Sequence, residues 1–485
     1  MASTQYVCQT CGAQSPKWSG QCRDCGAWNS LVEERVSAKE KKGRSLSARS
    51  DSEGEGNPKS SELLHVGALK DPKLIARIPS GISEVDRVLG GGLVPGSLLL
   101  FGGEPGIGKS TLLLQVLGNL SAAGNKSLYL SGEESAAQVG GRFKRLKLQE
   151  SENLFFLSTT ELEAAIEEIQ KLKPKIVIVD SVQTLSSETI ESAAGTVSQI
   201  RMATHEFLSV AKNLGVVVIL VGHVTKEGTV AGPRLLEHMV DGVFYFELAT
   251  SSGYRLLRGQ KNRFGATHEV AVFEMRPQGL MQVENPSARF LAEKVDGVAG
   301  SSVVAHLEGS RPFLTEFQAL CQKCYVGYPR RTVQGIDQNR IAVLMAVAEK
   351  TLNISFSDQD VYCKVASGDR LVEPAVDLAV LMALISAVEN RPLPADLLFV
   401  GEVGLGGEIR SVPNIAARIA EAKTVGIKKI VLPQWNLKET LDEKNLKIIP
   451  VKKLKEAYAE AFNVKNKTQL DSKGIDKDFL DDVSP

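Results

Sequence analysis

The sequence predicts an α/β protein with a mainly parallel sheet, preceded by a small metal-binding module and followed by an α+β domain. Between residues 75 and 285, short apolar runs alternate with helical segments, and continuous apolar strands are typical of a parallel sheet covered on both faces. The first of these runs leads into a glycine-rich phosphate-binding motif. Paired cysteines occupy the first 25 residues, which indicates a separate metal-binding module.

Length and composition limit the class of protein. A chain of 485 residues has room for about two to four domains. Lysine and arginine together number 57, as do aspartate and glutamate, so the net charge of zero excludes a uniformly basic nucleic-acid coat but allows a local basic groove. No run approaches the ~20 apolar residues of a membrane span, and the first ten residues lack the features of a secretory signal. We therefore expect a cytoplasmic enzyme without a membrane segment.

Four cysteines near the start predict a zinc site. They have the spacing C-x2-C-x10-C-x2-C and are Cys8, Cys11, Cys22 and Cys25. Four thiolates complete a closed tetrahedral shell, so the zinc would be structural rather than catalytic. Glycines 12, 20 and 26 supply the turns, and bound metal supplies the folding energy that about 34 residues cannot obtain from a core. A redox-active dithiol pair is the alternative.

Composition divides the chain into five segments. A stretch rich in Ser, Gly, Lys and Glu predicts a flexible linker after the cysteines, and the polar end of the chain predicts a disordered tail. The segments are the C4 zinc finger at 1–34, the linker at 35–62, a nucleotide-binding domain at 63–285, an α+β domain at 286–463 and the tail at 464–485.

Apolar runs and helical patterns place the elements of both domains. In the nucleotide-binding domain we expect buried strands at 97–102, 127–131, 175–180 and 216–222, helices near 110–122, 161–172 and 196–213, and antiparallel hairpins over 242–275. In the second domain we expect helices near 337–351, 375–389 and 413–425, and strands at 396–403 and 428–433.

A phosphate-binding loop follows the strand at 97–102. It matches G-x4-G-K-[ST] and consists of Gly103, Glu104, Pro105, Gly106, Ile107, Gly108, Lys109, Ser110 and Thr111. A strand before the motif and a helix after it are the context that supports a P-loop. Glycines let backbone N–H groups turn toward phosphate oxygens. We expect the loop to bind ATP, with Lys109 at the β- and γ-phosphates and Ser110 on Mg²⁺.

Polar residues at strand ends are candidates for the remaining catalytic groups. Asp180 ends the apolar run KIVIVD and would hold the magnesium shell through water, unless it only caps the strand. Glu133, in SGEES, is the candidate general base, with Glu134 as its rival. His223 ends the strand at 216–222 and precedes a glycine-bearing polar segment. It is either a γ-phosphate sensor or an ordinary hydrogen-bonded histidine.

Two basic segments are candidates for nucleic-acid contact. The segment 224–238 carries Lys226 and Arg234 and would be a loop ordered by ligand or DNA. Lys261 and Arg263 lie two residues apart in KNRFG, so on an extended chain their side chains point to the same side. They could reach a phosphate in a neighbouring subunit, or they could be an ordinary surface pair.

These motifs together resemble the RadA family of bacterial DNA-repair ATPases over nearly the whole chain. CQTCGAQSPKWSGQCRDCGAWNS resembles the family's zinc finger, GEPGIGKST its Walker A motif and KNRFG its signature. The region from Ser80 to about 285 resembles a RecA-type ATPase core and favours Glu133 over Glu134 as the base. The resemblance implies a homo-hexamer that binds single-stranded DNA and drives branch migration of recombination intermediates alongside the RecA recombinase. It also implies that Lys261 and Arg263 act across the subunit interface on nucleotide and DNA.

The last domain is similar to the proteolytic domain of Lon. The turn that would carry the Lon nucleophile is Pro374, Ala375, Val376 and Asp377. The resemblance puts Ala375 at the serine position and Ala416 at the lysine position, so neither member of the dyad is present. We expect oligomerisation and DNA contact instead, with Arg330, Arg331 and Arg340 as candidates for DNA or as plain surface charge. Cys321, Cys324 and Cys363 are expected to be buried structural thiols.

We therefore expect a DNA-dependent ATPase of recombinational repair that uses ATP, Mg²⁺ and Zn²⁺. The alternative is a nucleotide-gated regulatory scaffold of the KaiC type, with no motor activity and no stimulation by DNA. A Lon-type protease is disfavoured because both dyad residues are missing.

Overall fold

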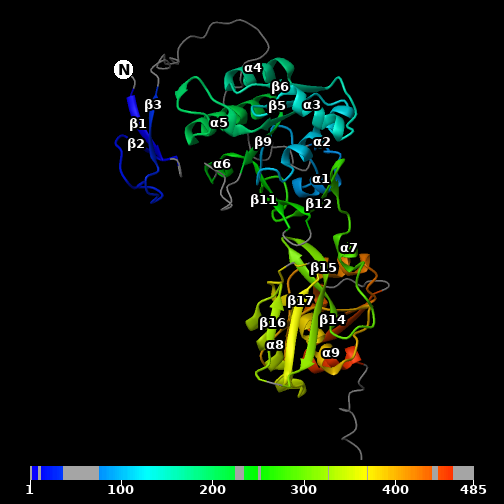
Figure 1. Cartoon of the computed structure of the whole chain (residues 1–485). Coiled ribbons are helices and arrows are strands. Elements are labelled where there is room, and N and C mark those ends of the chain that lie inside the picture. The colour runs from blue at the N-terminus through cyan, green and yellow to red at the C-terminus, as the bar shows by residue number, and fades with distance from the viewer. Residues whose placement is uncertain are drawn as a thin grey trace, which may run out of the picture. The chain divides into compact units, whose positions relative to one another are not determined.

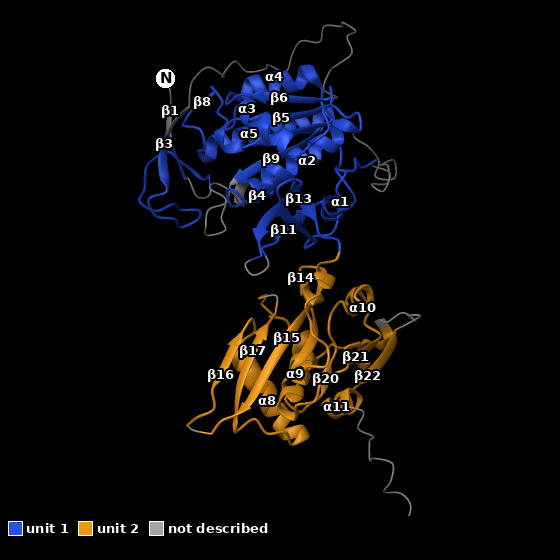
Figure 2. Ribbon diagram, turned by 45° about the vertical axis from the view of Figure 1, so that its right-hand side comes forward, with its two compact units in different colours: residues 1–249, 253–284 blue, residues 250–252, 285–485 orange. Residues whose placement is uncertain are grey.

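The computed structural model describes residues 3–8, 12–36, 76–223, 234–249, 253–325, 327–366, 368, 370–439 and 446–462. The chain forms two compact units, which Figures 1 and 2 show. Unit 1 is residues 1–249 with 253–284, and unit 2 is residues 250–252 with 285–485. Among the described residues, no helix combines the length and the apolar character that crossing a membrane requires.

Unit 1 begins with a small antiparallel sheet around the cysteines. Its strands, in the order β2-β1-β3-β8, are β1 (Ser3–Cys8), β2 (Gln14–Ser15), β3 (Leu31–Val36) and β8 (Ile190–Glu191). Among its described residues, the buried apolar cluster is formed by Cys8, Cys22 and Leu31, with Tyr6 and Ala13 packed against them. So small a core supplies little folding energy, which favours stabilisation by a bound metal.

The main body of unit 1 is a sheet of nine described strands in the order β13-β12-β11-β10-β4-β9-β7-β5-β6. The strands are β4 (Leu98–Gly103), β5 (Ser127–Ser131), β6 (Leu154–Ser158), β7 (Ile176–Asp180), β9 (Val217–His223), β10 (Gly242–Leu248), β11 (Arg255–Asn262), β12 (Val270–Arg276) and β13 (Gly279–Gln282). Strands β10, β4, β9, β7, β5 and β6 run parallel, so their carboxyl ends share one edge.

Helices cover both faces of this sheet. One apolar cluster joins it to α1 (Ser83–Leu89), α2 (Lys109–Ala122) and α3 (Ala136–Arg145). A second cluster, on the other face, includes α4 (Leu162–Leu172), α5 (Val197–Leu214), α6 (Arg234–Met239) and the 3₁₀ turn at Val182–Thr184. This is the covered parallel sheet that the apolar strands predicted.

The expected antiparallel hairpins over 242–275 are present: β10 pairs with β11 and β11 with β12, and β13 continues the series. On its other side β10 lies parallel to β4 and pairs Gly242 with Leu99 and Phe246 with Gly103, so the hairpins extend the parallel sheet. The chain leaves β9, forms α6 and returns on the other side of β4 in the same direction.

Unit 2 is built around a four-stranded sheet in the order β14-β15-β17-β16. The strands are β14 (Ser301–Glu308), β15 (Arg311–Lys323), β16 (Arg331–Gln334) and β17 (Gln359–Val365). Helices α8 (Gln338–Leu352) and α9 (Asp377–Glu389) pack on one face. Near the other face lie α7 (Pro286–Leu291), α10 (Ile415–Thr424) and a parallel sheet of β18 (Leu397–Phe399), β21 (Lys429–Pro433) and β22 (Lys447–Val451).

Smaller elements complete unit 2. They are η5 (Pro374–Val376), η6 (Gln434–Glu439), α11 (Leu454–Phe462) and the ribbon of β19 (Glu402–Val403) and β20 (Ile409–Arg410). The single strand expected at 396–403 is therefore two strands, β18 and β19, in different sheets. Between them Gly401 donates its N–H to the carbonyl of Ala375 and accepts from the N–H of Leu378, so the chain turns to join η5 and α9.

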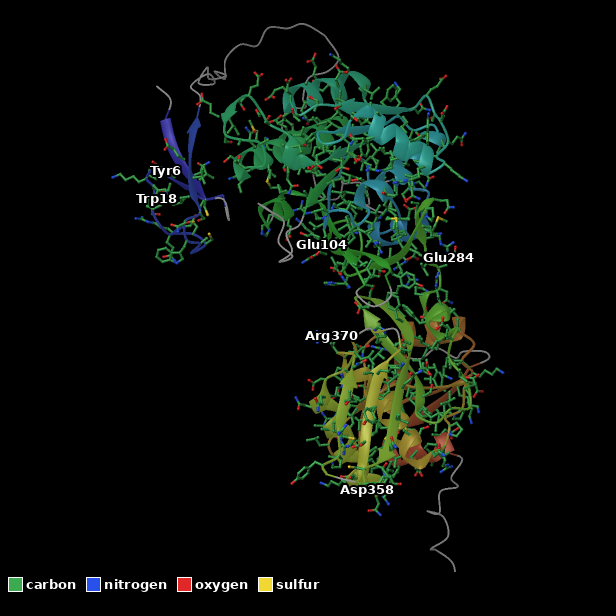
Figure 3. All side chains as sticks on the ribbon, viewed as in Figure 1. Tyr6, Trp18, Glu104, Glu284, Asp358 and Arg370 are labelled. Carbon is green, nitrogen blue, oxygen red and sulfur yellow. The ribbon has the colours of Figure 1, made fainter. Side chains whose placement is uncertain are left out.

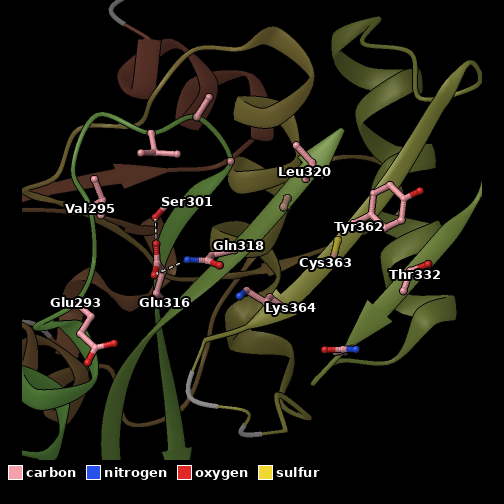
Figure 4. Close-up of a pocket in the computed structure, with 15 residues that line it drawn as sticks. Glu293, Val295, Ser301, Glu316, Gln318, Leu320, Thr332, Tyr362, Cys363 and Lys364 are labelled. Carbon is pink, nitrogen blue, oxygen red and sulfur yellow. Dashed lines mark hydrogen bonds between the residues drawn. The ribbon is translucent and has the colours of Figure 1, made fainter. Parts of the chain in front are cut away.

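A cavity of about 600 Å³ lies on the face of β15 and β17 that points away from α8 and α9 (Figure 4). Leu320, Tyr362 and Thr332 form one cross-strand row along it. At its buried end, Glu316 accepts hydrogen bonds from Ser301 and Gln318. The cavity belongs to unit 2 alone and contains none of the residues predicted for nucleotide chemistry.

Candidate functional site

The phosphate-binding loop connects β4 to α2 at the carboxyl edge of the parallel strands. Gly106 and Gly108 have φ angles of 78° and 116°, which are readily accessible only to glycine. Glu104 is exposed at this loop and is labelled in Figure 3. Lys109 is only 3% exposed, and its Nζ donates to the carbonyls of Gly103 at 2.8 Å and Glu104 at 3.0 Å. The Lys109 side chain thus folds back onto its own loop. To reach a bound phosphate, it would have to leave these two carbonyls.

The electrostatics of Lys109 link it to two carboxylates. Burial lowers the pKa of Lys109, while the charges of Asp180 and Glu133 oppose that shift. Asp180 ends β7, and register pairs it with Ser131 on β5, two residues before Glu133. On the neighbouring strand β9, His223 pairs with Gly103. The structure therefore brings these predicted residues to one edge of the sheet, where open α/β folds bind their ligands.

The surroundings of Asp180 suit a magnesium shell. Its side chain is buried, and the hydroxyl of Tyr129 donates to its Oδ2 at 2.6 Å. Within the described chain no cationic side chain forms an ion pair with it, so its negative charge remains available. Carboxylate and hydroxyl oxygens are what Mg²⁺ prefers, and Ser110, in the first turn of α2, adds a hydroxyl. Asp180, with Ser110, therefore fits a Mg²⁺–nucleotide.

The two candidate bases differ in their partners. Glu134 forms a bidentate ion pair with Arg142, with distances of 2.5 and 2.6 Å. Glu133 accepts a hydrogen bond from the hydroxyl of Ser181 at 2.6 Å. Because a guanidinium occupies both oxygens of Glu134, the contacts favour Glu133 as the group that faces the nucleotide.

Sequence reasoning did not identify Tyr129 and Ser181. A signal for Tyr129 was present, because SLYLS places a tyrosine in an otherwise buried aliphatic strand and a buried tyrosine hydroxyl usually needs a partner. Burial and the Asp180 charge raise the pKa of Tyr129, so its hydroxyl stays protonated and acts as a donor. Ser181 offered no such signal, since its partner lies 48 residues away.

The KNRFG segment divides into structural residues and projecting ones. The amide of Asn262 donates to the carbonyl of Val88 at 3.3 Å. Gly265 lies so close to Gly90 that a Cβ atom on it would come within 2.8 Å of the Gly90 Cα atom. Asn262 and Gly265 therefore fasten the end of β11 to the end of α1.

Lys261 and Arg263 contact the amino end of the parallel strands. Lys261 donates to the carbonyl of Glu237 at 2.6 Å. Arg263 is 59% exposed, and its guanidinium lies 3.2 Å from Asp241. Burial and the charge of Arg263 lower the pKa of Lys261.

Asp241, which sequence reasoning missed, anchors Arg263 to the sheet. It is buried and also binds Lys212 at 2.8 Å and the N–H of Leu98 at 3.1 Å. Burial alone would raise the pKa of Asp241, but these hydrogen bonds and the nearby cations hold it below its usual value. Leu98 begins β4 and Gly103 ends it, so Arg263 sits about 17 Å from the phosphate loop of its own chain.

The remaining predicted DNA contacts lie partly beyond what the structure describes. Lys226 is outside the described residues. The main chain of Arg234 lies at the first position of α6.

The cysteines form two equivalent turns. The N–H of Gly12 donates to the carbonyl of Cys8, as Gly26 does to Cys22, and both glycines have φ near 75°. The sulfur atoms of Cys8, Cys22 and Cys25 lie within 4.8 Å of one another, and those of Cys8 and Cys25 are 3.7 Å apart. Tetrahedral zinc with bonds of about 2.3 Å separates its sulfurs by about 3.8 Å. These thiols fit zinc, and Cys11 lies outside the described residues.

The turn that resembles the Lon nucleophile turn is closed by ion pairs. Ala375 is 2% exposed, whereas Ala416 is exposed on α10. One residue before Pro374, Glu373 pairs with the fully buried Arg418 at 2.5 Å.

Asp377, which follows the turn, pairs with Arg340 at 2.6 Å. Arg340 also donates to the carbonyls of Val372 and Glu373, and Arg331 binds the carbonyl of Phe356. These two arginines therefore brace unit 2, which argues against the expectation that they face DNA.

Burial raises the pKa of Cys321 to about 11 and of Cys363 to about 12. Thiols with such raised pKa values are unreactive. Of the three cysteines that were expected to be buried, Cys363 is buried, whereas Cys321 and Cys324 are partly exposed.

Three family models match the chain. The KaiC model of ATPases matches residues 78–286, a rubredoxin metal-binding domain matches 6–33, and the model of subunit ChlI of Mg-chelatase matches 320–436. A solved KaiC-like protein from Pyrococcus horikoshii covers 43% of this chain and 99% of its own, with 18% identity and a TM-score of 0.37. The predicted fold class, a RecA-like ATPase core with a zinc module and a Lon-like region, is confirmed by the family models.

Curated relatives match over almost the whole length. The DNA repair protein RadA of Bacillus subtilis is 46% identical over 460 residues, which cover 94% of this chain and 98% of the relative. RadA of Pseudomonas aeruginosa is 46% identical over 95% of this chain and 99% of its own. With this identity over almost the whole chain, the chain belongs to the RadA family of DNA repair proteins, and its first unit carries a KaiC-type P-loop ATPase domain.

Proposed function

We propose that this protein is a DNA-dependent ATPase of recombinational repair, a hexameric ring motor that drives branch migration of recombination intermediates on single-stranded DNA. The observation that carries the proposal is that the nucleotide-binding residues and Arg263 lie at opposite edges of the parallel sheet in unit 1. The nucleotide groups lie at the carboxyl edge of the parallel strands, and Arg263 lies at the amino edge beside Leu98. A finger that cannot reach its own nucleotide is what a ring of subunits requires.

The contacts of Lys261 and Arg263 support action across an interface. Arg263 is held by a buried carboxylate yet remains mostly exposed, so it is oriented and accessible at once. Lys261 is held by a main-chain carbonyl. A neighbour's γ-phosphate could displace these contacts without disturbing Asn262 and Gly265, which fasten the segment to α1.

The proposed roles at the nucleotide follow from position. Lys109 stabilises negative charge on the β- and γ-phosphates, and Ser110 and Asp180 hold Mg²⁺, which supplies charge neutralisation when bound. Glu133 accepts a proton from the attacking water. Lys226 and Arg234 would contact DNA. The RecA recombinase is the proposed protein partner, and it would act on the same DNA.

We also propose that unit 2 does not hydrolyse peptides. The nucleophile position holds Ala375, which has no hydroxyl, and Glu373 and Asp377 beside it are engaged by arginines. Activation of a nucleophile needs an adjacent base, and both carboxylates beside this turn are already bound by arginines.

The test of a trans-acting finger is a mixing experiment. We would measure ATP turnover, with and without single-stranded DNA, for Lys109→Ala, for Arg263→Ala and for a mixture of the two. Each variant alone should lose DNA-stimulated turnover. In mixed rings an intact phosphate loop can face an intact finger, so turnover should return to about one quarter of the wild-type level if the subunits mix at random. Arg276→Ala, which removes an exposed arginine from the same unit, serves as the control.

Three outcomes separate the hypotheses. No recovery in the mixture would reject action across the interface. Wild-type turnover that ignores DNA would instead support a regulatory scaffold. Unchanged turnover in Lys109→Ala would reject the assigned nucleotide site.

A further inference from the structure

We propose that Tyr129 and Ser181 are positioning residues for ATP hydrolysis, with Tyr129 orienting the magnesium carboxylate of Asp180 and Ser181 orienting the general base Glu133. This inference rests on the proposed ATPase activity of unit 1 and specifies how its two acidic groups are held. Neither residue touches the nucleotide in this proposal, because each acts through a carboxylate.

The contact of Tyr129 with Asp180 is buried, and the tyrosine is held both by this hydrogen bond and by the packing of its ring. The tyrosine is 1% exposed on β5, and its hydroxyl donates to Asp180 Oδ2 at 2.6 Å. Its ring stacks on Phe156 of β6, with centroids 6.3 Å apart and an interplanar angle of 17°. No second side chain in the described chain donates to Asp180. One oxygen of the carboxylate is therefore anchored, and the Asp180 carboxylate would help to hold Mg²⁺ when the ion is bound.

The hydrogen bond between Tyr129 and Asp180 has a fixed direction, because the phenol hydroxyl donates and the carboxylate oxygen accepts. A neutral donor fixes the carboxylate without cancelling its charge, which a lysine or arginine would do. Groups that orient metal-binding residues from outside typically change metal affinity or activity by about 10–100-fold when removed.

Ser181 connects the base to the metal carboxylate through the main chain. It follows Asp180 directly, is fully buried and donates to Glu133 Oε1 at 2.6 Å. Its own carbonyl accepts a hydrogen bond from Thr184 at 2.8 Å. The main chain of Glu133 donates in turn to Ser131 at 3.3 Å. One rigid turn at the end of β7 thus sets the spacing between proton acceptor and metal ligand.

The neighbouring cation does not interfere with this arrangement. Arg142 uses two guanidinium nitrogens on Glu134, and its pKa is raised by that pairing although burial opposes it. In the described chain, both hydrogen bonds of this guanidinium to a carboxylate therefore go to Glu134. The sequence EES therefore contains one acid that binds an arginine and one that is proposed to do chemistry.

The two positioning roles predict different defects. Tyr129→Phe removes only the hydroxyl, so we expect the Mg²⁺ concentration for half-maximal turnover to rise about 10-fold or more, with little loss of kcat at saturating Mg²⁺. Ser181→Ala should lower kcat about 10–100-fold at an unchanged Mg²⁺ requirement. Ser181→Thr keeps the hydroxyl and should recover part of kcat.

A binding measurement makes the test independent of turnover. We would titrate a non-hydrolysable ATP analogue into each variant by calorimetry, with and without Mg²⁺, and compare the gain in affinity that Mg²⁺ provides. Tyr129→Phe should reduce that gain about 10-fold and leave metal-free binding unchanged. Tyr245→Phe is the matched control, because it removes another tyrosine–carboxylate hydrogen bond, to Glu237 at 2.8 Å, in the same unit.

The outcomes distinguish this inference from the function on which it rests. If the wild type neither hydrolyses ATP nor binds the analogue, the proposed ATPase fails. If the wild type is active and Tyr129→Phe has the Mg²⁺ dependence of Tyr245→Phe, the role of Tyr129 is rejected while the ATPase stands. An unchanged kcat in Ser181→Ala rejects the role of Ser181 alone. Unchanged metal-free analogue binding in each variant shows that the site is still folded.

Discussion

At the nucleotide edge of unit 1, the two acidic groups are held by hydroxyls. Asp180 accepts from Tyr129, and Glu133 accepts from Ser181, each at 2.6 Å. Neutral donors compensate for the loss of water and leave the negative charge in place. The charge can then act on a cation that arrives with a ligand.

Beside the Ala375 turn of unit 2, the acidic groups are held by arginines. Glu373 faces the buried Arg418 and Asp377 faces Arg340, at 2.5 and 2.6 Å. Guanidinium groups neutralise the carboxylates as well as satisfying them. Burial raises the pKa of Asp377 although Arg340 opposes this shift.

The difference shows that the hydrogen-bond partner of a buried acidic side chain indicates the role of that side chain better than the extent of its burial does. An acid paired with a guanidinium braces the fold, whereas an acid held by hydroxyls retains a charge that chemistry can use. The same contrast recurs over one residue in unit 1, where Glu134 binds Arg142 and Glu133 binds Ser181.

The strongest test exchanges the acid for its amide in both places. Asp180→Asn should lower ATP turnover about 100-fold or more, because a charge that stabilises the reacting complex is lost. Its free energy of unfolding should change by less than about 1 kcal/mol, since Asn can still accept from Tyr129. Steady-state turnover and urea denaturation measure the two effects.

Asp377→Asn is the matched exchange in unit 2 and should show the reverse pattern. We expect turnover to be unchanged and unit 2 to be destabilised by about 1–3 kcal/mol, because the Arg340 guanidinium loses its counter-charge. If both variants lost activity equally, the distinction between hydroxyl-held and arginine-held acids would be wrong.

The next test breaks the buried pair in unit 2. Arg418→Ala leaves Glu373 without its cation and opens space in the core, so unit 2 should lose about 3–5 kcal/mol of stability. Hydrogen exchange of α9 and α10 amides in urea would report it. Arg410→Ala, which breaks an exposed pair with Glu408, should change stability by less than about 1 kcal/mol. Equal effects of the two changes would contradict the assigned role of Arg418.

The small sheet β2-β1-β3-β8, which carries the zinc-binding cysteines, would contain a third kind of neutralised acidic group, a thiolate bound by metal. Cys25→Ser should lower the zinc content per chain and remove exchange protection from residues 12–36, because their apolar cluster is too small to fold without metal. Basal ATP turnover should stay within about two-fold of wild type, since no nucleotide group contacts this sheet in the described chain. Cys324→Ser, from the other CxxC pair, is the control. Full zinc content in Cys25→Ser would mean that the ligand set is wrong.

How far the sequence predicts these features depends on the distance between partners. The phosphate loop and its flanking strand and helix are local in the chain, so their pattern identified the site. Tyr129 and Asp180 are 51 residues apart, and Arg418 and Glu373 are 45 apart. Such pairs form only when the topology brings two strands or turns together, so a buried tyrosine in SLYLS signals that its hydroxyl needs a partner without identifying Asp180 as that partner. The parallel pairing of β10 with β4 is likewise set by the topology and not by the apolar pattern of β10.

The smallest expected effect is that of restoring the Lon dyad in unit 2, and it tests most strictly whether acids held by arginines exclude catalysis. Restoring both dyad positions in Ala375→Ser/Ala416→Lys should produce no peptide hydrolysis above the wild-type background. The new serine would be buried and the new lysine exposed on α10, so the base could not take the hydroxyl proton. Casein digestion followed by mass spectrometry is the measurement, with the single variants as controls. Cleavage that appears only in the double variant would show that this turn is still organised for catalysis, and that arginine-held acids are compatible with a working site.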